Sequence, residues 1–141
     1  MTQEEKQLVL KDLCARLPHG VICRANEINL DGELLFINKI YNIVALYNDK
    51  ATGKFDACPI DDVKPSLRPM SSMTEEEMIS YYGKKMIIGQ IKDGHTTYIP
   101  EYNTLDWLLA HHFDFRGLIT MGLALEAPED MYIMVSNTGE K

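Results

Sequence analysis

Apolar residues recur at helical spacing over the first 17 residues of the chain. Thr2 precedes Glu5 by three positions, the pattern of a capping box in which hydroxyl and carboxylate each accept a backbone N–H. The apolar positions that follow are Leu10, Leu13, Cys14 and Leu17. The charged positions predicted to lie away from them are Glu4, Glu5, Lys6, Lys11, Asp12 and Arg16. We therefore expect a helix that ends near Pro18–Gly20 and packs on the segment after it.

Between residues 21 and 70 the pattern changes to short β-type runs. The predicted strands are 21–23, 34–37, 40–47 and 55–60, separated by turn signals at Asp31-Gly32 and at residues 48–53. In the run 40–47 both alternating faces are apolar, which predicts a central strand that is covered on both sides. One side carries Tyr41, Ile43, Ala45 and Tyr47, and the other carries Ile40, Val44 and Leu46.

The second half of the chain begins with another capping box, formed by Thr74 and Glu77. It predicts a helix with Met78 and Tyr82 on its buried side and Gly83 at its end. A hairpin is predicted next, from runs 86–91 and 95–99 around Lys92-Asp93-Gly94. Near the end of the chain, residues 131–135 are predicted to form an edge strand or a loose terminus.

A last helix is predicted over residues 104–113. One face of it carries Leu105, Leu108, Leu109 and His112. Trp107 and His111 lie on nearly the opposite face. If that face is open, Trp107 is a strong binding anchor, because Trp dominates interface hot spots. The alternative is that Trp107 packs inside the domain.

Together these elements predict a single α+β domain that spans residues 1–141. Its N-terminal helix packs on a small antiparallel sheet, which is either strongly bent or closed into an SH3-like barrel. The β-rich part covers about 21–70, and a part with helices and a hairpin covers about 74–135. Of the residues, 45% are hydrophobic and 25% are charged, which is typical of one ordinary globular domain.

Charge and cysteine content narrow the classes of protein. Residues 71–141 carry 5 basic and 11 acidic side chains and hold most of the net charge of −7. No apolar run is long enough for a membrane helix, and the acidic start is unlike a secretory signal, so we predict a cytoplasmic protein with no membrane partner. Three cysteines are an odd number, which favours reduced thiols over a disulfide framework.

Nucleic-acid binding is the alternative function for the β-rich part. It depends on a basic set with aromatic residues nearby: Arg24, Lys39, Lys50, Lys54, Lys64 and Arg68, with Tyr41, Tyr47 and Phe55. Phosphate contacts need clustered positive charge, and this half of the chain is close to neutral. We therefore rank nucleic-acid binding second.

A small enzyme or metal-binding protein is the third alternative. Cys14, His19 and Cys23 approach zinc spacing but have no evident fourth ligand, and His111 and His112 are adjacent, so they point about 100° apart on a helix. His112 is predicted to be a core histidine, with Asp114 or a backbone carbonyl as its partner. Phosphate-binding, dinucleotide-binding and nucleophile-elbow motifs are all missing from the sequence. We predict no catalytic residue, no metal ligand and no cofactor.

Three stretches resemble a known group of proteins. They are KDLCARLPHGVIC (residues 11–23), DDVKPSLRPMSSMT (61–74) and DFRGLI with GLALEAP (114–119 and 122–128). They are similar to a group of short uncharacterised proteins that recur in genomes of gut Bacteroidales and their prophages. The resemblance implies a link to phage or mobile-element biology and brings no activity, cofactor or catalytic residue.

The sequence as a whole favours a non-enzymatic protein-interaction or regulatory module. The absence of a catalytic motif, the acidic C-terminal half and the possible anchor at Trp107 support this hypothesis. The residues predicted to contact an unknown protein partner are Trp107 and His111.

Overall fold

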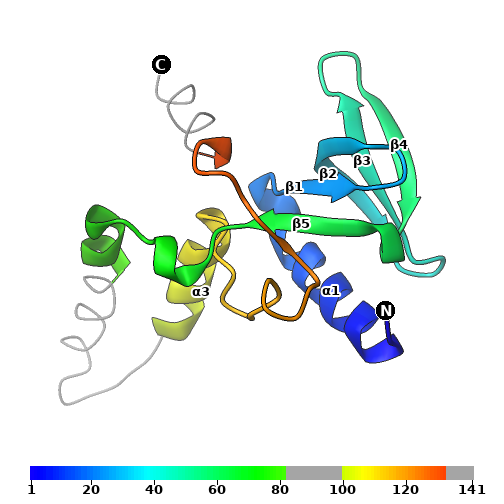
Figure 1. The fold of residues 1–141 in the computed structure, drawn as a ribbon. Coiled ribbons are helices and arrows are strands. Elements are labelled where there is room, and N and C mark those ends of the chain that lie inside the picture. Colours follow the sequence, from blue (N-terminus) through cyan, green and yellow to red (C-terminus); the bar gives the residue numbers. More distant parts are fainter. Residues whose placement is uncertain (82–99, 133–141) are drawn as a thin grey trace.

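The computed structural model describes residues 1–81 and 100–132 (Figure 1). Its helices are α1 (Gln3–Arg16) and α3 (Pro100–Ala110), with a further helical segment over residues 75–81. Its strands are β1 (Ile22–Ala25), β2 (Leu30–Asn38), β3 (Ile43–Asp49), β4 (Lys54–Pro59), β5 (Val63–Leu67) and β6 (Leu125–Glu126). Short 3-10 turns lie at Leu17–His19, Ile60–Asp62 and Met70–Ser72.

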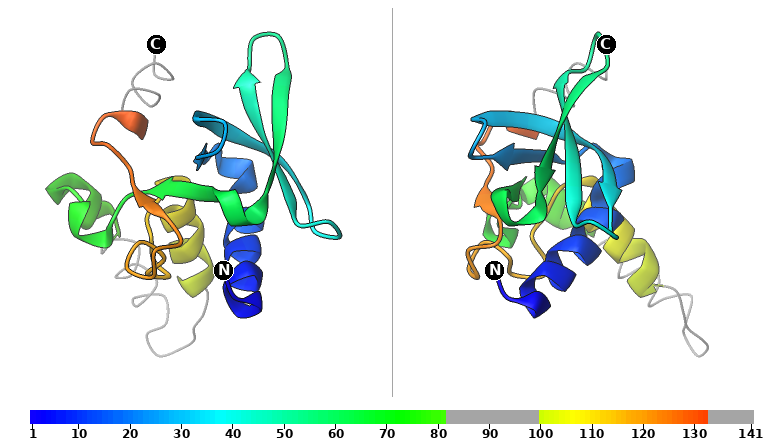
Figure 2. Two further views of the ribbon diagram at one scale, coloured as in Figure 1. Left: turned by 45° about the vertical axis from the view of Figure 1, so that its right-hand side comes forward. Right: turned by 90° about the vertical axis from the view of Figure 1, so that its right-hand side faces the viewer.

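The sheet follows the order β4-β3-β2-β1-β5-β6, and all its pairings are antiparallel except that of β5 with β6. The predicted α+β class is therefore confirmed, with α1 packed on the sheet (Figures 1 and 2). Within the described residues β4 and β6 are the edges, so the sheet is open. Strand β3 lies next to the β4 edge, and the β3–β4 hairpin projects beyond the helices (Figure 2).

Helix α1 begins as the sequence predicts. The Thr2 hydroxyl accepts the Glu5 N–H at 3.0 Å, and the Glu5 carboxylate accepts the Thr2 N–H at 2.9 Å. After the helix, Gly20 adopts a left-handed φ of 71°, which glycine tolerates without strain.

The buried face of α1 matches the prediction at Leu10 and Leu13 and differs from it elsewhere. The residues it buries are Val9, Leu10, Asp12, Leu13 and Arg16, whereas Cys14 is exposed. Asp12 and Arg16 were expected to face solvent. They are buried because they lie on one helix face with Leu13, and that face meets both the sheet and the C-terminal loop.

The turn before β2 also differs from the prediction. Asp31-Gly32 lies inside β2, where Gly32 is opposite Cys23. A Cβ atom on Gly32 would overlap the carbonyl oxygen of Tyr47, so this glycine permits a close approach of two backbones. The turn itself covers residues 26–29 and ends at Asn29, whose φ is 52°.

A buried ionic cluster joins α1 to the loop after α3. Arg16 donates to the Asp12 carboxylate at 2.7 Å and to the carbonyl oxygen of Phe113 at 2.7 Å. Arg116 donates to the other oxygen of Asp12 at 2.9 Å. Both guanidinium groups lie over the Phe115 ring, at 5.3 and 4.8 Å from its centroid. The cluster thus ties together two segments about 100 positions apart in the sequence.

The second capping box is confirmed, because the Glu77 N–H donates to the Thr74 hydroxyl at 3.1 Å and the Thr74 N–H to the Glu77 carboxylate at 2.9 Å. The predicted buried side of that helix is wrong at Met78, which is exposed. Tyr82, the predicted end at Gly83, the predicted hairpin of 86–91 and 95–99, and residues 133–135 lie outside the described residues. Residues 131–132 are helical rather than extended.

Helix α3 begins at Pro100 and ends at Ala110, a little earlier at both ends than predicted. Leu108 and Leu109 are buried as expected, but Leu105 is exposed. His112 follows the helix with a left-handed φ of 63°. The Phe113 N–H donates back to the Leu108 carbonyl, which closes the helix end as in a Schellman motif.

Candidate interaction surface

Strands β2, β3 and β4 carry two different apolar faces. The strand register places Leu34, Ile37, Val44, Leu46 and Cys58 on one face, and these side chains join the core beneath α1. The opposite face, which we call the outer face, consists of Phe36, Ile43, Ala45, Tyr47, Phe55, Ala57 and Pro59, with Asn38 as its one polar member. A sheet with one side in water normally carries polar residues on that side. The outer face departs from this rule.

Two phenylalanines dominate the outer face. Phe36 on β2 and Phe55 on β4 meet across β3 in an edge-to-face contact, with ring centroids 5.5 Å apart and planes at 74°. The side chain of Ala45 on the strand between them is fully buried. The two rings themselves remain 40% and 48% exposed. The described part of the chain therefore orders this aromatic pair but does not cover it.

The β2–β3 turn presents two further apolar side chains. Ile40 is 84% exposed and Tyr41 is 71% exposed. The Asn38 side chain accepts the backbone N–H groups of both residues, at 3.1 and 3.2 Å, and Asn42 closes the turn with a φ of 54°. These bonds fix the turn, so both side chains are held in solvent by a defined backbone.

The sequence predicts coverage on both faces of β3, and the described residues provide coverage on one. Val44 and Leu46 lie in the core, whereas Ile43 and Tyr47 are half-buried on the outer face. In the right-hand view of Figure 2, β3 and β4 lie in front of α1, so the outer face is on the side away from that helix.

The predicted contact residues, Trp107 and His111, do not lie on the outer face but in an aromatic cluster around helix α3. Trp107 is only 9% exposed, and its ring stacks on His111 at 4.0 Å and lies 5.9 Å from Phe113 and 5.5 Å from Tyr81. His111 Nδ1 is 2.9 Å from the Trp107 carbonyl oxygen. The structure therefore removes the open face on which the anchor hypothesis depended, because Trp107 packs inside the protein. The binding role of the two residues stays a prediction.

Arg68 links this aromatic cluster to the segment 70–81. Its guanidinium lies over the Phe113 ring at 4.2 Å and donates to both carboxylate oxygens of Glu77 at 2.7 and 2.6 Å. Such a two-pronged contact fixes orientation as well as charge. Arg68 is therefore engaged in holding the fold.

The basic set considered for nucleic acid is partly neutralised. Arg24 donates to Asp31 at 2.8 Å and also bonds the side chain of Asn29, and Lys50 donates to Glu33 at 2.7 Å. With Arg68 paired as above, half of the six basic residues are held by carboxylates. This pairing lowers the positive charge available for phosphates.

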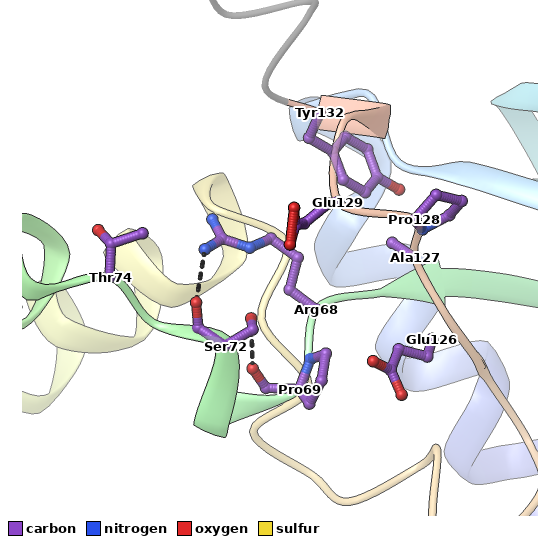
Figure 3. Close-up of a pocket in the computed structure, with 9 residues that line it drawn as sticks. All are labelled: Arg68, Pro69, Ser72, Thr74, Glu126, Ala127, Pro128, Glu129 and Tyr132. Atoms are coloured by element: carbon purple, nitrogen blue, oxygen red, sulfur yellow. Dashed lines mark hydrogen bonds between the residues drawn. The ribbon is translucent and has the colours of Figure 1, made fainter.

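One cavity has a volume of about 730 Å³ (Figure 3). Its walls include Arg68, Glu126, Glu129 and Tyr132. Arg68 is already paired with Glu77, and the Tyr132 hydroxyl donates to the Ser66 carbonyl at 2.7 Å. Among the described residues that line this cavity, no nucleophile lies at bonding distance from a base.

A second cavity of about 430 Å³ is lined in part by His19, Glu33, Lys50, His112 and Tyr132. The His112 ring stacks on Tyr132 at 3.6 Å, and its Nδ1 has no hydrogen-bond partner. Burial, followed by the charge of Arg16, lowers the pKa of His112 to about 3, so the ring is neutral near pH 7.

The predicted partner for this histidine is wrong. The carboxylate of Asp114 instead accepts the backbone N–H groups of Leu118 at 2.8 Å and Ile119 at 2.9 Å. Asp114 therefore caps the turn that follows it. His112 is half-buried at the wall of the cavity rather than in the core, and its ring stacks on Tyr132 and makes no hydrogen bond through Nδ1.

The candidate metal ligands do not converge. Cys14 is exposed on α1, whereas Cys23 is fully buried in β1, where desolvation raises its pKa. Cys58 is buried in β4 and its pKa is likewise raised by desolvation. In residues 1–81 and 100–132 no group of three or more His, Cys, Asp or Glu side chains is placed to hold a metal ion.

Comparison with known proteins found no matching family model, no matching curated protein and no matching solved structure. In the described part of the chain, no helix has the length and apolar character needed to cross a bilayer.

Proposed function

We propose that this chain is a non-enzymatic protein-interaction or regulatory module whose contact surface is the outer face together with the β2–β3 turn. The single observation that supports it is the exposed Phe36–Phe55 pair on a sheet face that is apolar almost throughout. The cytoplasmic location and the link to phage or mobile elements inferred from the sequence stay predictions.

The composition of the surface suits a protein partner. Interface hot spots are enriched in aromatic residues that sit at the centre of a patch. Phe36 and Phe55 are already oriented by their mutual contact, and Ile40 and Tyr41 are held by a fixed turn. Side chains that are ordered before binding lose less conformational entropy in the complex. The partner is therefore expected to present an apolar surface to Phe36 and Phe55.

Photo-crosslinking in the producing cell tests the proposal. A photoreactive phenylalanine analogue replaces Phe36, and the same analogue at Ile28, which is also about half exposed but lies in the β1–β2 turn, is the matched control. A partner crosslinked from position 36 and not from position 28 is then purified. We expect Phe36→Ser and Tyr41→Ser each to weaken its binding at least about ten-fold, and Ile28→Ser to leave it unchanged.

Two results contradict the proposal. One is the same set of crosslinked proteins from positions 28 and 36. The other is a purified partner that binds Phe36→Ser and Tyr41→Ser as tightly as the unmodified chain.

A further inference from the structure

Among the described residues, no strand pairs with the outer edge of β4. Where β3 and β4 meet, the Ile60 N–H donates to the Asn42 carbonyl at 2.9 Å. In an antiparallel ladder such pairs recur at every second residue, so Asp56 and Cys58 direct their backbone groups toward β3. Phe55 and Ala57 then direct their N–H and C=O groups away from the sheet. Pro59 has no N–H and limits the free edge at its end.

The side chains along this edge complement a copy of themselves. Lys54 and Asp56 flank Phe55 and lie on the same face of the strand. If two β4 strands pair antiparallel with Phe55 opposite the other Phe55, each Lys54 lies opposite an Asp56. These are non-hydrogen-bonded pairs, in which side chains approach most closely.

The neighbouring registers are unfavourable. Two β4 strands can form hydrogen bonds only when residues whose backbone groups point away from the sheet, such as Phe55 and Ala57, lie opposite each other. The register between the two copies can therefore change only between arrangements that keep such residues paired. One step in one direction places Asp56 opposite Asp56, and one step in the other places Lys54 opposite Lys54. Like charges directly opposite each other destabilise a strand pair. Of these three registers, only the one centred on Phe55 places opposite charges opposite each other.

We infer that β4 pairs with β4 of a second copy of this chain, antiparallel and centred on Phe55, so that two sheets join into one. The inference rests on the proposed function, because it names one partner for the same exposed part of the sheet. The two Phe55 rings meet on the outer face, next to Phe36 of each copy. The resulting symmetry is two-fold, and each copy contributes the same residues.

The size of the contact predicts a weak dimer. Strand β4 is six residues long, and Pro59 at its end and Lys54 at its start are features that usually protect an edge from pairing. In this register Lys54 becomes an attractive group, because it faces a carboxylate. Such a short contact falls in the class of small, transient interfaces. We therefore expect dimers that form and dissociate with protein concentration.

Exchange of the two charges tests the inference by analytical ultracentrifugation of the full chain over a concentration series. We expect Lys54→Asp and Asp56→Lys each to weaken dimerisation at least about ten-fold, because each places like charges opposite each other. The double variant Lys54→Asp/Asp56→Lys should dimerise as the unmodified chain does. An equimolar mixture of the two single variants should form the mixed dimer, in which both charge pairs are again opposite in sign.

Lys11→Asp is the matched control, since it makes the same change in net charge as Lys54→Asp at an exposed position of α1, outside the proposed contact surface, and should leave dimerisation unchanged. Circular dichroism checks that each variant is folded, which matters for Asp56 because its carboxylate accepts a hydrogen bond from Asn48 at 2.7 Å. A monomer at every concentration overturns the inference, as does a dimer that both single charge variants leave intact. If the crosslinked partner of Phe36 still depends on Phe36 while the chain stays monomeric, the proposed function stands and only this inference fails.

Discussion

Two regions of this protein reverse the usual distribution of polar and apolar side chains. Where α1 meets the C-terminal loop, Asp12 and Arg16 are fully buried. On the outer face of β2–β4, Phe36 and Phe55 remain about half exposed. In the first region the Asp12 carboxylate accepts hydrogen bonds from both Arg16 and Arg116, and Arg16 also donates to the Phe113 carbonyl, although its buried Nη1 has no hydrogen-bond partner among the described residues. In the second region the described residues supply no cover. The difference teaches that the first region is covered by contacts between distant segments of the chain, whereas the second is left open by the described residues, which is the basis of the proposed interaction surface.

The largest effect is expected from breaking the buried ionic cluster. Arg16→Ala should lower the free energy of unfolding by about 3–5 kcal/mol, because it leaves a cavity and deprives the buried Asp12 carboxylate of one cation. The measurement is urea unfolding followed by circular dichroism. Arg24→Ala is the control. Its pair with Asp31 is solvent-exposed, so its loss should cost less than about 1 kcal/mol.

A double variant sharpens this test. Asp12→Leu/Arg16→Met replaces both charges with apolar groups of similar size and should regain part of the lost stability, since buried pairs are often no better than well-packed apolar residues. Equal stability losses for Arg16→Ala and Arg24→Ala would show that the cluster does not hold α1 to the loop.

The next effect compares a buried aromatic residue with an exposed one. Trp107→Ala should lower the free energy of unfolding by about 3 kcal/mol, because the indole packs against Tyr81, His111 and Phe113. Phe36→Ala should lower it by less, by about 1 kcal/mol, because its ring makes one aromatic contact and is 40% exposed. Similar losses for the two variants would place Phe36 in the core and remove the basis for the interaction surface.

The smallest effect is a pH dependence that arises from His112. In the folded protein its pKa is lowered to about 3, whereas in the unfolded chain it has the ordinary value of 6.5. Between these values the unfolded chain binds one more proton, so the stabilising contribution of the neutral ring is lost as pH falls from 6.5 toward 3. Protonation of His112 in the unfolded chain should raise the unfolding equilibrium constant by up to about ten-fold for each unit by which the pH falls in this range.

The variant His112→Asn isolates this contribution, because Asn lacks the titrating ring and tolerates the left-handed backbone found at position 112. Urea unfolding at pH 7, 6 and 5 should show a smaller fall in stability for the variant than for the unmodified chain. Parallel pH profiles for the two proteins would mean that His112 titrates in the folded state as it does in the unfolded state.

Much of the local structure could be predicted, since it depends on residues close in sequence. The capping boxes at Thr2 and Thr74 each need only two residues three positions apart. The choice of buried face on α1 could not be predicted in this way. The predicted and the observed buried faces share Leu10 and Leu13, but the observed one extends to Val9 and Arg16 instead of Cys14. The charge of Arg16 favours an exposed position, but the loop after α3 supplies the Phe113 carbonyl as its partner.

The candidate interaction surface could likewise be predicted in its local pattern but not in which of its side chains are exposed. The alternation in residues 40–47 predicts a strand with two apolar faces, and the structure shows both faces from Ile43 onward. The prediction is wrong for Ile40 and Tyr41, which lie in the β2–β3 turn because Asn38 accepts their backbone N–H groups. The sequence also suggested that Trp107 could be the exposed anchor, whereas the described aromatic residues that stay largely exposed lie on the outer face and its turn. Which aromatic ring is covered depends on contacts between distant segments, and a single helix face does not contain that information.

The sequence alone determined where α1 starts and which strands alternate, because these properties arise from neighbouring residues. Only the tertiary structure decided that Arg16 is inside and Phe36 is outside. Burial depends on which surfaces meet, and Arg16 reaches its carbonyl partner on Phe113 only after the chain has folded back over 97 positions.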